Sequence, residues 1–192
     1  MNIDNLNLDT QETTKAAQAI LGSHLVRTLS SGEQLVGRIV ETEAYHQSDP
    51  ATHAHRGKTE RNRVMFEAAG VAYVYFTYGM HYCFNIVTGP EDEAAAVLIR
   101  AVEPIEGIET MQANRKATDL HNLCSGPAKF TQAFAIDLSL NGHNLEAPPL
   151  ELKRGAPVAS NDIKTTTRIG ISQNTDAPWR FYIKDNAFIS RR

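Results

Sequence analysis

Three side chains that could do chemistry stand at alternate positions of one stretch: Glu41, Glu43 and Tyr45. Alternate residues of an extended strand share a face, so the two carboxylates and the ring are expected side by side. A carboxylate can act as a general base, and a flat ring can stack on a planar ligand. The alternative is a pair of exposed strand glutamates, the common fate of charged residues.

The stretch 47–62 that follows is predicted to be a long loop, and long loops in compact domains are usually functional. It contains His53 and His55, a spacing that can ligate zinc. No third histidine follows at a recognisable spacing, and no HExxH motif occurs. A histidine that hydrogen-bonds a ligand in a pocket is therefore favoured over a metal ligand.

The same loop carries a basic run, in which Arg56, Lys58, Arg61 and Arg63 face one acid, Glu60. Such a run could contact the phosphates of a nucleic acid, and a solvated basic loop is the alternative. The net charge of the whole chain, -3, argues mildly against a dedicated DNA-binding domain, because such domains are usually basic.

Aromatic residues cluster between 73 and 84, in two predicted strands of a hairpin. Most of them are expected in the core, but Tyr78 and Met80 fall at the hairpin tip, where small polar residues are usual. A tyrosine there could act as a wedge between base pairs. A carboxylate, a stacking ring, a basic run and a wedge are the parts needed to extrude a base and cut its glycosidic bond.

The elements expected to position these residues are strands in adjacent hairpins with helices between them. This pattern predicts an α+β fold with a largely antiparallel sheet rather than a doubly wound parallel sheet. Gly37 is a candidate bulge. The predicted strands are 24–29, 35–45, 71–76, 81–87, 94–102, 150–153, 166–171 and 180–183.

Four helical segments are predicted. The first follows an Asp9–Glu12 capping box and ends at Gly22. A single turn is expected at 64–69, and a longer helix is expected from Pro104 to about Lys116. The last one takes Ser125 as its N-cap and has a proline in its first turn.

Composition bounds the class of protein. The length of 192 residues suits one domain, and a chain that is 42% hydrophobic and 21% charged is not disordered. Cys83 and Cys124 form neither a metal nor a redox spacing, which favours reduced thiols in a cytosolic protein. Neither a membrane span nor a secretory signal is expected, because no long apolar run occurs and the first ten residues are polar and acidic.

With these motifs in place, the chain resembles the alkyladenine (3-methyladenine) DNA glycosylases, in a bacterial form without a long N-terminal extension. The resemblance covers nearly the whole chain from about Asp9. The matching segments, in order, are 41–45, His53, 61–62, 65–66, 73–75, 78–80, Asn85, 98–104, 124–127, 168–171 and 180–182.

The resemblance implies residue roles. Glu43 would be the general base on the attacking water, and Arg100 would help to hold that water and the abasic nucleotide. The backbone near Ile169 would also position the water. The glutamate next to this site, Glu41, receives no role beyond local structure.

The same resemblance implies a pocket for the extruded purine formed by Tyr45, His53 and Tyr75. Asn85 would stand against the 2-amino group of guanine.

On the DNA side, the resemblance implies that Tyr78 fills the gap left in the duplex, with Met80 beside it. Arg56, Lys58 and Arg61 would contact the DNA, although the residue pattern of this loop differs from that of mammalian members.

The expected protein is thus a single α+β domain with a curved, largely antiparallel sheet and flanking helices, spanning 9–192 after a flexible segment 1–8. The expected partner is double-stranded DNA with damaged purines, bound by a monomer. Neither a cofactor nor a metal nor a membrane is expected, and the location is cytoplasmic, on the nucleoid when bound to DNA.

No lyase step is expected, because the pocket segments hold no lysine apart from Lys58. Two alternative functions remain: that of a non-catalytic binder of distorted DNA and that of a metal-dependent hydrolase.

Overall fold

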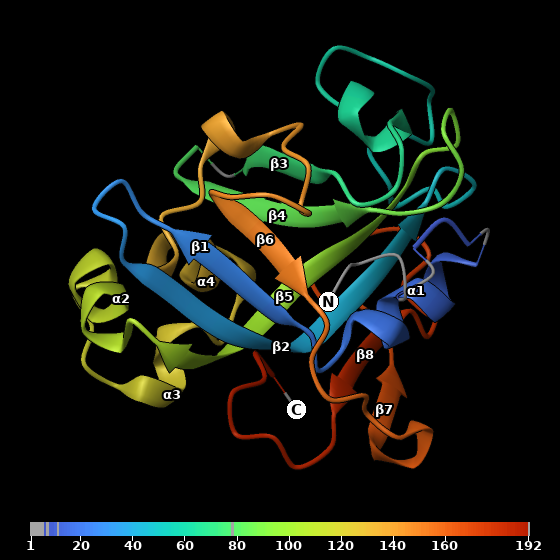
Figure 1. Ribbon diagram of the computed structural model, residues 1–192. Coiled ribbons are helices and arrows are strands. Elements are labelled where there is room, and N and C mark those ends of the chain that lie inside the picture. Colours follow the sequence, from blue (N-terminus) through green and yellow to red (C-terminus); the bar gives the residue numbers. More distant parts are fainter. Residues whose placement is uncertain (1–5, 7, 11, 78, 192) are drawn as a thin grey trace.

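The computed structural model describes residues 6, 8–10, 12–77 and 79–191 (Figure 1). Within these residues eight strands form one curled sheet, in which every pairing is antiparallel. The order along the main path is β3-β4-β5-β2-β1-β6, and β8 pairs with both β2 and β7. The strands are β1 (His24–Thr28), β2 (Gln34–His46), β3 (Ala72–Thr77), β4 (His81–Val87), β5 (Ala95–Glu106), β6 (Leu150–Lys153), β7 (Ile163–Thr166) and β8 (Arg180–Ile183).

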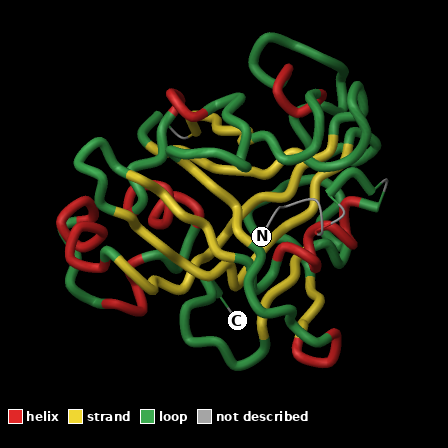
Figure 2. The backbone as a smooth tube through the Cα atoms, viewed as in Figure 1, coloured by secondary structure: helices red, strands yellow, loops and turns green. Residues whose placement is uncertain are grey.

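Helices flank this sheet at two places. Three of them gather near one end of β2 and β5, whereas α1 lies on the side of the β7–β8 hairpin (Figures 1 and 2). The predicted fold class, a single α+β domain with a curved antiparallel sheet, is confirmed. The helices are α1 (Thr13–Ile20), α2 (Ile108–Arg115), α3 (Leu120–Leu123) and α4 (Pro127–Ala133), with short 3-10 turns η2 (Arg63–Phe66), η3 (Leu138–Leu140) and η4 (Ser160–Asp162).

The long strand β2 changes its neighbour part-way along. Its first half, from Gln34 to Arg38, pairs with β1, and the segment Glu41–Glu43 pairs with β8. On its other edge β2 pairs with β5, with register shifts on both sides of Glu41 and at Gly37. The predicted irregularity at Gly37 is confirmed. The segment Glu41–Glu43 is therefore enclosed by a strand on each side.

The prediction that a helix starts at Pro104 is wrong for the first turn of that helix. Residues up to Glu106 remain in β5, and Pro104 stands opposite Gly37 at a register shift, a place where a strand tolerates proline. The helix begins only after Gly107, whose backbone is left-handed with a φ of 74°. A glycine in this conformation turns the chain out of the sheet.

Three further local predictions are wrong. Glu12 precedes α1 but its side chain makes no capping bond; its carboxylate binds Lys15 Nζ at 2.7 Å instead. Gly126, not Ser125, precedes α4. The strand expected at 166–171 ends at Thr166, and the following residues form a loop. Local patterns locate such elements but do not fix their ends, which depend on tertiary contacts.

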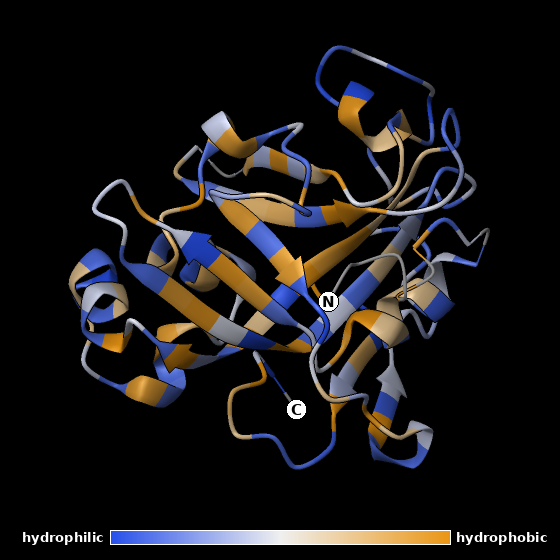
Figure 3. Ribbon diagram, viewed as in Figure 1, coloured by the Kyte–Doolittle hydropathy of each residue, from blue (hydrophilic) through white to orange (hydrophobic). Residues whose placement is uncertain are grey.

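The core lies between the sheet and its helices. The largest buried rings include Tyr73, Phe84, Phe130 and Phe134. Figure 3 shows hydrophobic residues concentrated on the central strands and hydrophilic ones on the outer loops. Of segment 1–8, expected to be flexible, the structure describes two residues, Leu6 and Leu8, and both are buried in this core. Among the described residues, no helix is long and apolar enough to cross a membrane.

We predict that Gly37→Ala lowers the free energy of unfolding by about 1–3 kcal/mol, because a core that is already filled resists an extra methyl group. A Cβ at this position would lie 2.2 Å from Cγ1 of Val102 and 2.9 Å from Cζ of Phe134. Thermal or urea unfolding measures the loss. As a control, Gly32→Asn should leave stability nearly unchanged, because nothing lies near that position and asparagine tolerates a left-handed backbone. Equal stability of the two variants would contradict the prediction.

Candidate active site

The two strand glutamates, Glu41 and Glu43, are both fully buried. The alternative of exposed strand glutamates is therefore wrong. Both sit in the enclosed segment of β2, between β5 and β8. Burying a carboxylate is costly unless it is paired and hydrogen-bonded, so the partners of these two groups decide what the segment can do.

Arg100, on β5, lies between the two carboxylates. Its Nε is 3.2 Å from Oε1 of Glu41, and its Nη1 is 3.2 Å from Oε1 of Glu43. Arg100 falls at the point where the register of β5 against β2 shifts, since Ala101 faces Glu41 and Ile99 faces Thr42. The local bulge thus aims one guanidinium at both acids.

Glu41 has a larger set of partners than the sequence suggested. Its Oε1 also accepts a hydrogen bond from Nε of Arg180, on β8, at 2.7 Å. Ser190 contributes two more hydrogen bonds, one from its backbone and one from its hydroxyl. Two buried guanidiniums, Arg100 and Arg180, thereby balance the two buried carboxylates in charge.

Glu43 has fewer partners, and they hold both of its oxygens. The hydroxyl of Tyr45 donates to Oε2 at 2.8 Å, and the backbone N–H of Ile169 donates to Oε1 at 2.8 Å. Burial raises the pKa of the Glu43 carboxyl above its usual range, although Arg100, Ile169 and Tyr45 each oppose the rise. A carboxylate with a raised pKa is a stronger base.

A cavity of about 440 Å³ opens beside the groups that hold this carboxylate, although Glu43 itself is fully buried and does not line it. All five residues predicted for a pocket line it, although they come from strands and loops far apart in the sequence. Arg100 lines it too, so the cavity joins the buried ion pair to the surface. The five are Tyr45, His53, Tyr75, Asn85 and Ile169.

One wall of the cavity is the ring of Tyr45, which rests on a buried guanidinium. Cζ of Arg168 is 4.7 Å from the centroid of the Tyr45 ring and 5.1 Å from that of Trp179. Arg168 donates to the carbonyl of Ala44 at 3.1 Å and forms an ion pair with Asp49. The ring is therefore fixed from behind.

Two tyrosines, Tyr73 and Tyr75, and a histidine, His53, also line the cavity. The His53 ring meets the Tyr75 ring edge-on, with centroids 4.6 Å apart, and its Nδ1 lies 3.1 Å from the hydroxyl of Tyr73. Burial against these rings and the charge of Arg61 lower the pKa of His53. The imidazole is thus neutral at pH 7. Asn85 is buried and donates from Nδ2 to the carbonyl of Tyr73 at 3.1 Å.

The histidines of the loop do not build a metal site. His55 lies with Nδ1 3.3 Å from the carbonyl of Gln47, away from the Tyr73 partner of His53. In the described part of the chain, no three side chains among His, Cys, Asp and Glu come together as metal ligands.

The profile of the methylpurine-DNA glycosylase (MPG) family matches residues 7–187. The chain belongs to this family. The resemblance inferred from the sequence motifs is confirmed.

Three curated relatives align with this chain over almost their full lengths. Each of them is provisionally named 3-methyladenine DNA glycosylase. The protein from Carboxydothermus hydrogenoformans is 56% identical over 177 residues, which are 92% of this chain and 92% of the relative. That from Francisella tularensis subsp. tularensis is 51% identical over 184 residues, 94% and 95% of the two chains. That from Methanoculleus marisnigri is 46% identical over 185 residues, 95% of each.

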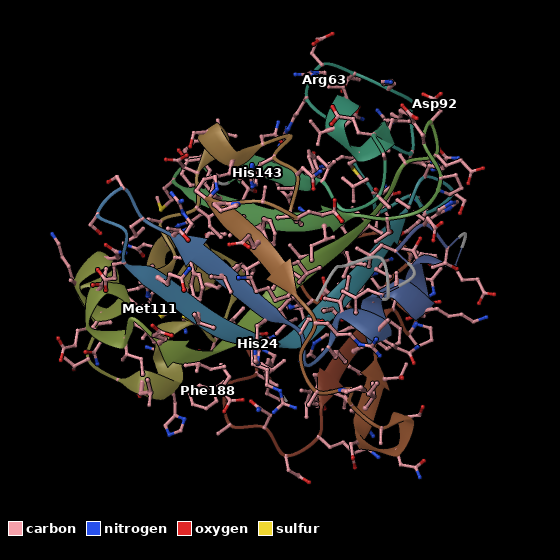
Figure 4. All side chains as sticks on the ribbon, in the orientation of Figure 1. His24, Arg63, Asp92, Met111, His143 and Phe188 are labelled. Carbon is pink, nitrogen blue, oxygen red and sulfur yellow. The ribbon has the colours of Figure 1, made fainter. Side chains whose placement is uncertain are left out.

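The basic residues predicted to meet DNA in this family member are exposed, but some have acidic neighbours. Arg56 is exposed, and Lys58 Nζ lies 3.9 Å from the carboxylate of Asp92. Arg61 reaches the carbonyl of Phe76 at 3.5 Å, linking the loop to the end of β3. Figure 4 shows Arg63, which follows the loop, and Asp92, from the connection between β4 and β5, near the same edge of the fold.

The tip of the β3–β4 hairpin exposes apolar side chains. Met80 is 68% exposed and Phe76 43% exposed, values unusual for residues of this type. Tyr78, the predicted wedge, lies outside the described residues.

Sequence reasoning missed the residues that support the site. Arg168 and Arg180 occur in motifs that it identified, but it assigned them no role. Nothing in the spacing reveals that Arg168 pairs with Asp49, which is 119 residues away, or that Arg180 pairs with Glu41. An arginine between hydrophobic residues, as Arg180 is between Trp179 and Phe181, is the one available signal of a buried ion pair, and Arg168 lacks it because Thr167 precedes it.

We predict opposite stability effects for the two acids. Glu41→Gln should lower the free energy of unfolding by about 3–5 kcal/mol, because it leaves Arg100 and Arg180 without their shared buried partner. Glu43→Gln should leave it unchanged or raise it. Burial raises the folded pKa of Glu43, so ionising this group opposes folding increasingly as the pH rises above the pKa of the unfolded glutamate. Urea denaturation at pH 7 measures both. A larger loss for Glu43→Gln than for Glu41→Gln would contradict this assignment.

Proposed function

We propose that this protein removes alkylated and deaminated purines from duplex DNA by hydrolysing their N-glycosidic bond, acting as a monomer. The observation that carries the proposal is the buried Glu43 carboxylate, which is held by Arg100 beside a cavity walled with aromatic rings. Membership of the methylpurine-DNA glycosylase family and the names of the relatives support the choice of reaction.

The purine would bind in the cavity after leaving the base stack. A base inside a duplex cannot reach a carboxylate buried behind the wall of a cavity, so the nucleotide must be flipped. Tyr45 and Tyr75 offer rings for stacking, and Arg168 holds the first of these in place. Neutral His53 would exchange a hydrogen bond with the base, and Asn85, which also lines the cavity, would reject the 2-amino group of guanine.

In the chemical step, Glu43 would take a proton from a water molecule as the water oxygen bonds to C1′ of the deoxyribose. The C1′–N bond breaks, and its electron pair leaves with the purine. A positively charged alkylated purine thereby leaves as a neutral molecule, whereas a neutral purine such as hypoxanthine also takes up a proton from solvent water. Positive charge develops on the sugar, as in glycoside hydrolysis, and a carboxylate beside C1′ stabilises it. Arg100 and the backbone carbonyl near Ile169 would hold the water and the abasic sugar.

The lesion contributes to the rate and to selectivity. An alkylated purine carries positive charge and leaves as a neutral molecule, which makes it a better leaving group. A weakly paired lesion also costs less to extrude than a normal base. Hypoxanthine, 3-methyladenine, 7-methylguanine and ethenoadenine are candidate substrates on these grounds.

The DNA would be held at the surface around the cavity. Arg56, Lys58 and Arg61 would contact phosphates, and these contacts would weaken with salt. Tyr78 with Met80 at the hairpin tip would fill the space left by the flipped nucleotide. Among the described residues that line the cavity there is no lysine, so the proposal includes no lyase step.

Glu43→Gln tests the proposal, because a glutamine keeps the shape of the side chain and loses the base. We expect loss of base release by a factor of at least about 100, the range typical of general-base catalysis. Affinity for the same lesion duplex should stay within about threefold. Base release from duplexes with each candidate lesion is followed in chelator, with a gel-shift titration alongside.

Near-normal excision by Glu43→Gln would contradict the proposed role of Glu43. Wild-type activity that disappears in chelator would favour the metal-dependent hydrolase. If the wild-type protein binds the lesion duplex tightly but releases no base, the result would favour a non-catalytic binder of distorted DNA.

The pH profile of base release should reflect the raised pKa of Glu43. The ionised form is the base, so the single-turnover rate should fall as pH decreases through the folded pKa. We expect the midpoint of this acidic limb to lie above the usual range of glutamate. Rates on 7-methylguanine duplexes at saturating enzyme give the profile, corrected for release without enzyme. A midpoint at or below that range would contradict the prediction.

A further inference from the structure

The segment 184–191, which follows β8, loops out and returns to the sheet beside α3 (Figure 1). It is tied down along its length. Asn186 donates from Nδ2 to Oε2 of Glu103 on β5 at 3.1 Å. The ring of Phe188 lies 4.9 Å from that of His121 on α3 and packs on the core (Figure 4). The segment thus has a fixed path.

This path ends with Ser190 against the buried carboxylate of Glu41. The backbone N–H of Ser190 donates to Oε2 at 2.6 Å, and its hydroxyl donates to Oε1 at 2.8 Å. Arg180 also binds the carbonyl of Arg191, so it clamps the segment next to the serine. Among the described residues, Ser190 is the sole donor to Oε2 of Glu41.

Two hydrogen bonds from one residue to both oxygens fix the plane of a carboxylate. The orientation of Glu41 in turn sets where Arg100 lies, because its Oε1 is 3.2 Å from Nε of that arginine. The other end of the same guanidinium is 3.2 Å from Glu43. A continuous chain of contacts therefore runs from Ser190 through Glu41 and Arg100 to Glu43.

We propose that Ser190 is a positioning residue for base excision, which holds Glu41 so that Arg100 stays aligned with Glu43. This inference rests on the proposed function. Ser190 does not line the cavity and does not touch Glu43, so its effect on the reaction passes through the two intervening side chains.

The chemistry of the contact explains why a serine suits this position. Glu41 Oε1 already accepts from two guanidiniums, and a small hydroxyl adds a third donor without adding charge. A hydrogen bond to a buried charged group is worth more than one between neutral groups. Without it the carboxylate can rotate towards either arginine, and Arg100 loses its fixed direction.

The test compares Ser190→Ala and Ser190→Thr with the wild type. The alanine keeps the backbone N–H and loses the hydroxyl, whereas the threonine keeps both. For Ser190→Ala we expect the single-turnover rate of base release at saturating enzyme to fall about tenfold, the size expected for one hydrogen bond to a charged group. Its Kd for the lesion duplex should stay within about twofold, and Ser190→Thr should recover most of the rate.

A matched control is Ser31→Ala, in the exposed turn between β1 and β2, which should keep the wild-type rate. A further arm places Ser190→Ala in a Glu41→Gln background, at a temperature where circular dichroism shows both proteins folded. If Ser190 acts through Glu41, the second substitution adds little to the loss.

A wild-type rate for folded Ser190→Ala would overturn the inference, and so would a loss that appears in Kd alone or one that threonine does not recover. A full additional loss in the Glu41→Gln background would also overturn it. Failure of the proposed function is a different result, because the wild type itself would then release no base from any of the four lesions.

Discussion

The structure depends on the burial of two carboxylates around one guanidinium. Glu41 and Glu43 lie two residues apart in a strand that is enclosed on both edges, and Arg100 touches both. Two like charges this close are stable only with matching cations, which explains the presence of Arg180. The pairing is unequal. Glu41 is saturated with donors, whereas Glu43 has fewer donors and a raised pKa, and three of its partners, Tyr45, Arg100 and Ile169, line the cavity. Placement thus separates a structural acid from one that can act as a base.

The fold serves this placement through irregularities rather than through regular elements. Register shifts beside Glu41 turn Arg100 towards the acids, and Gly37 leaves room for the side chains of Val102 and of Phe134, which follows α4, to approach the backbone of β2. The loop after β7 brings the backbone of Ile169 to Glu43 and the side chain of Arg168 behind Tyr45. Bulges and loops of this kind re-aim side chains where a regular sheet cannot.

The fold class and most of the strands could be predicted from the sequence, because alternation is a local signal, and the cavity residues could be named from the resemblance to the family. Pro104 shows where such reasoning fails: proline suggested a helix start, but pairing with Gly37 keeps it in the strand. The prediction for Glu41 was incomplete for a different reason. Strand parity placed it beside Glu43, yet its burial depends on Arg180 and Ser190, more than a hundred residues away. Partners so distant leave no trace in local patterns.

The account makes Glu43 a buried carboxyl that ionises less readily than an ordinary glutamate, and this property can be observed without any reaction. The most direct measurement is an infrared pH titration of the free protein, with Glu43→Gln subtracted from the wild type. The account predicts that a carboxyl C=O band attributable to Glu43 grows on acidification, with its midpoint above the usual glutamate range. A difference spectrum without such a band, or a midpoint at or below that range, would contradict it.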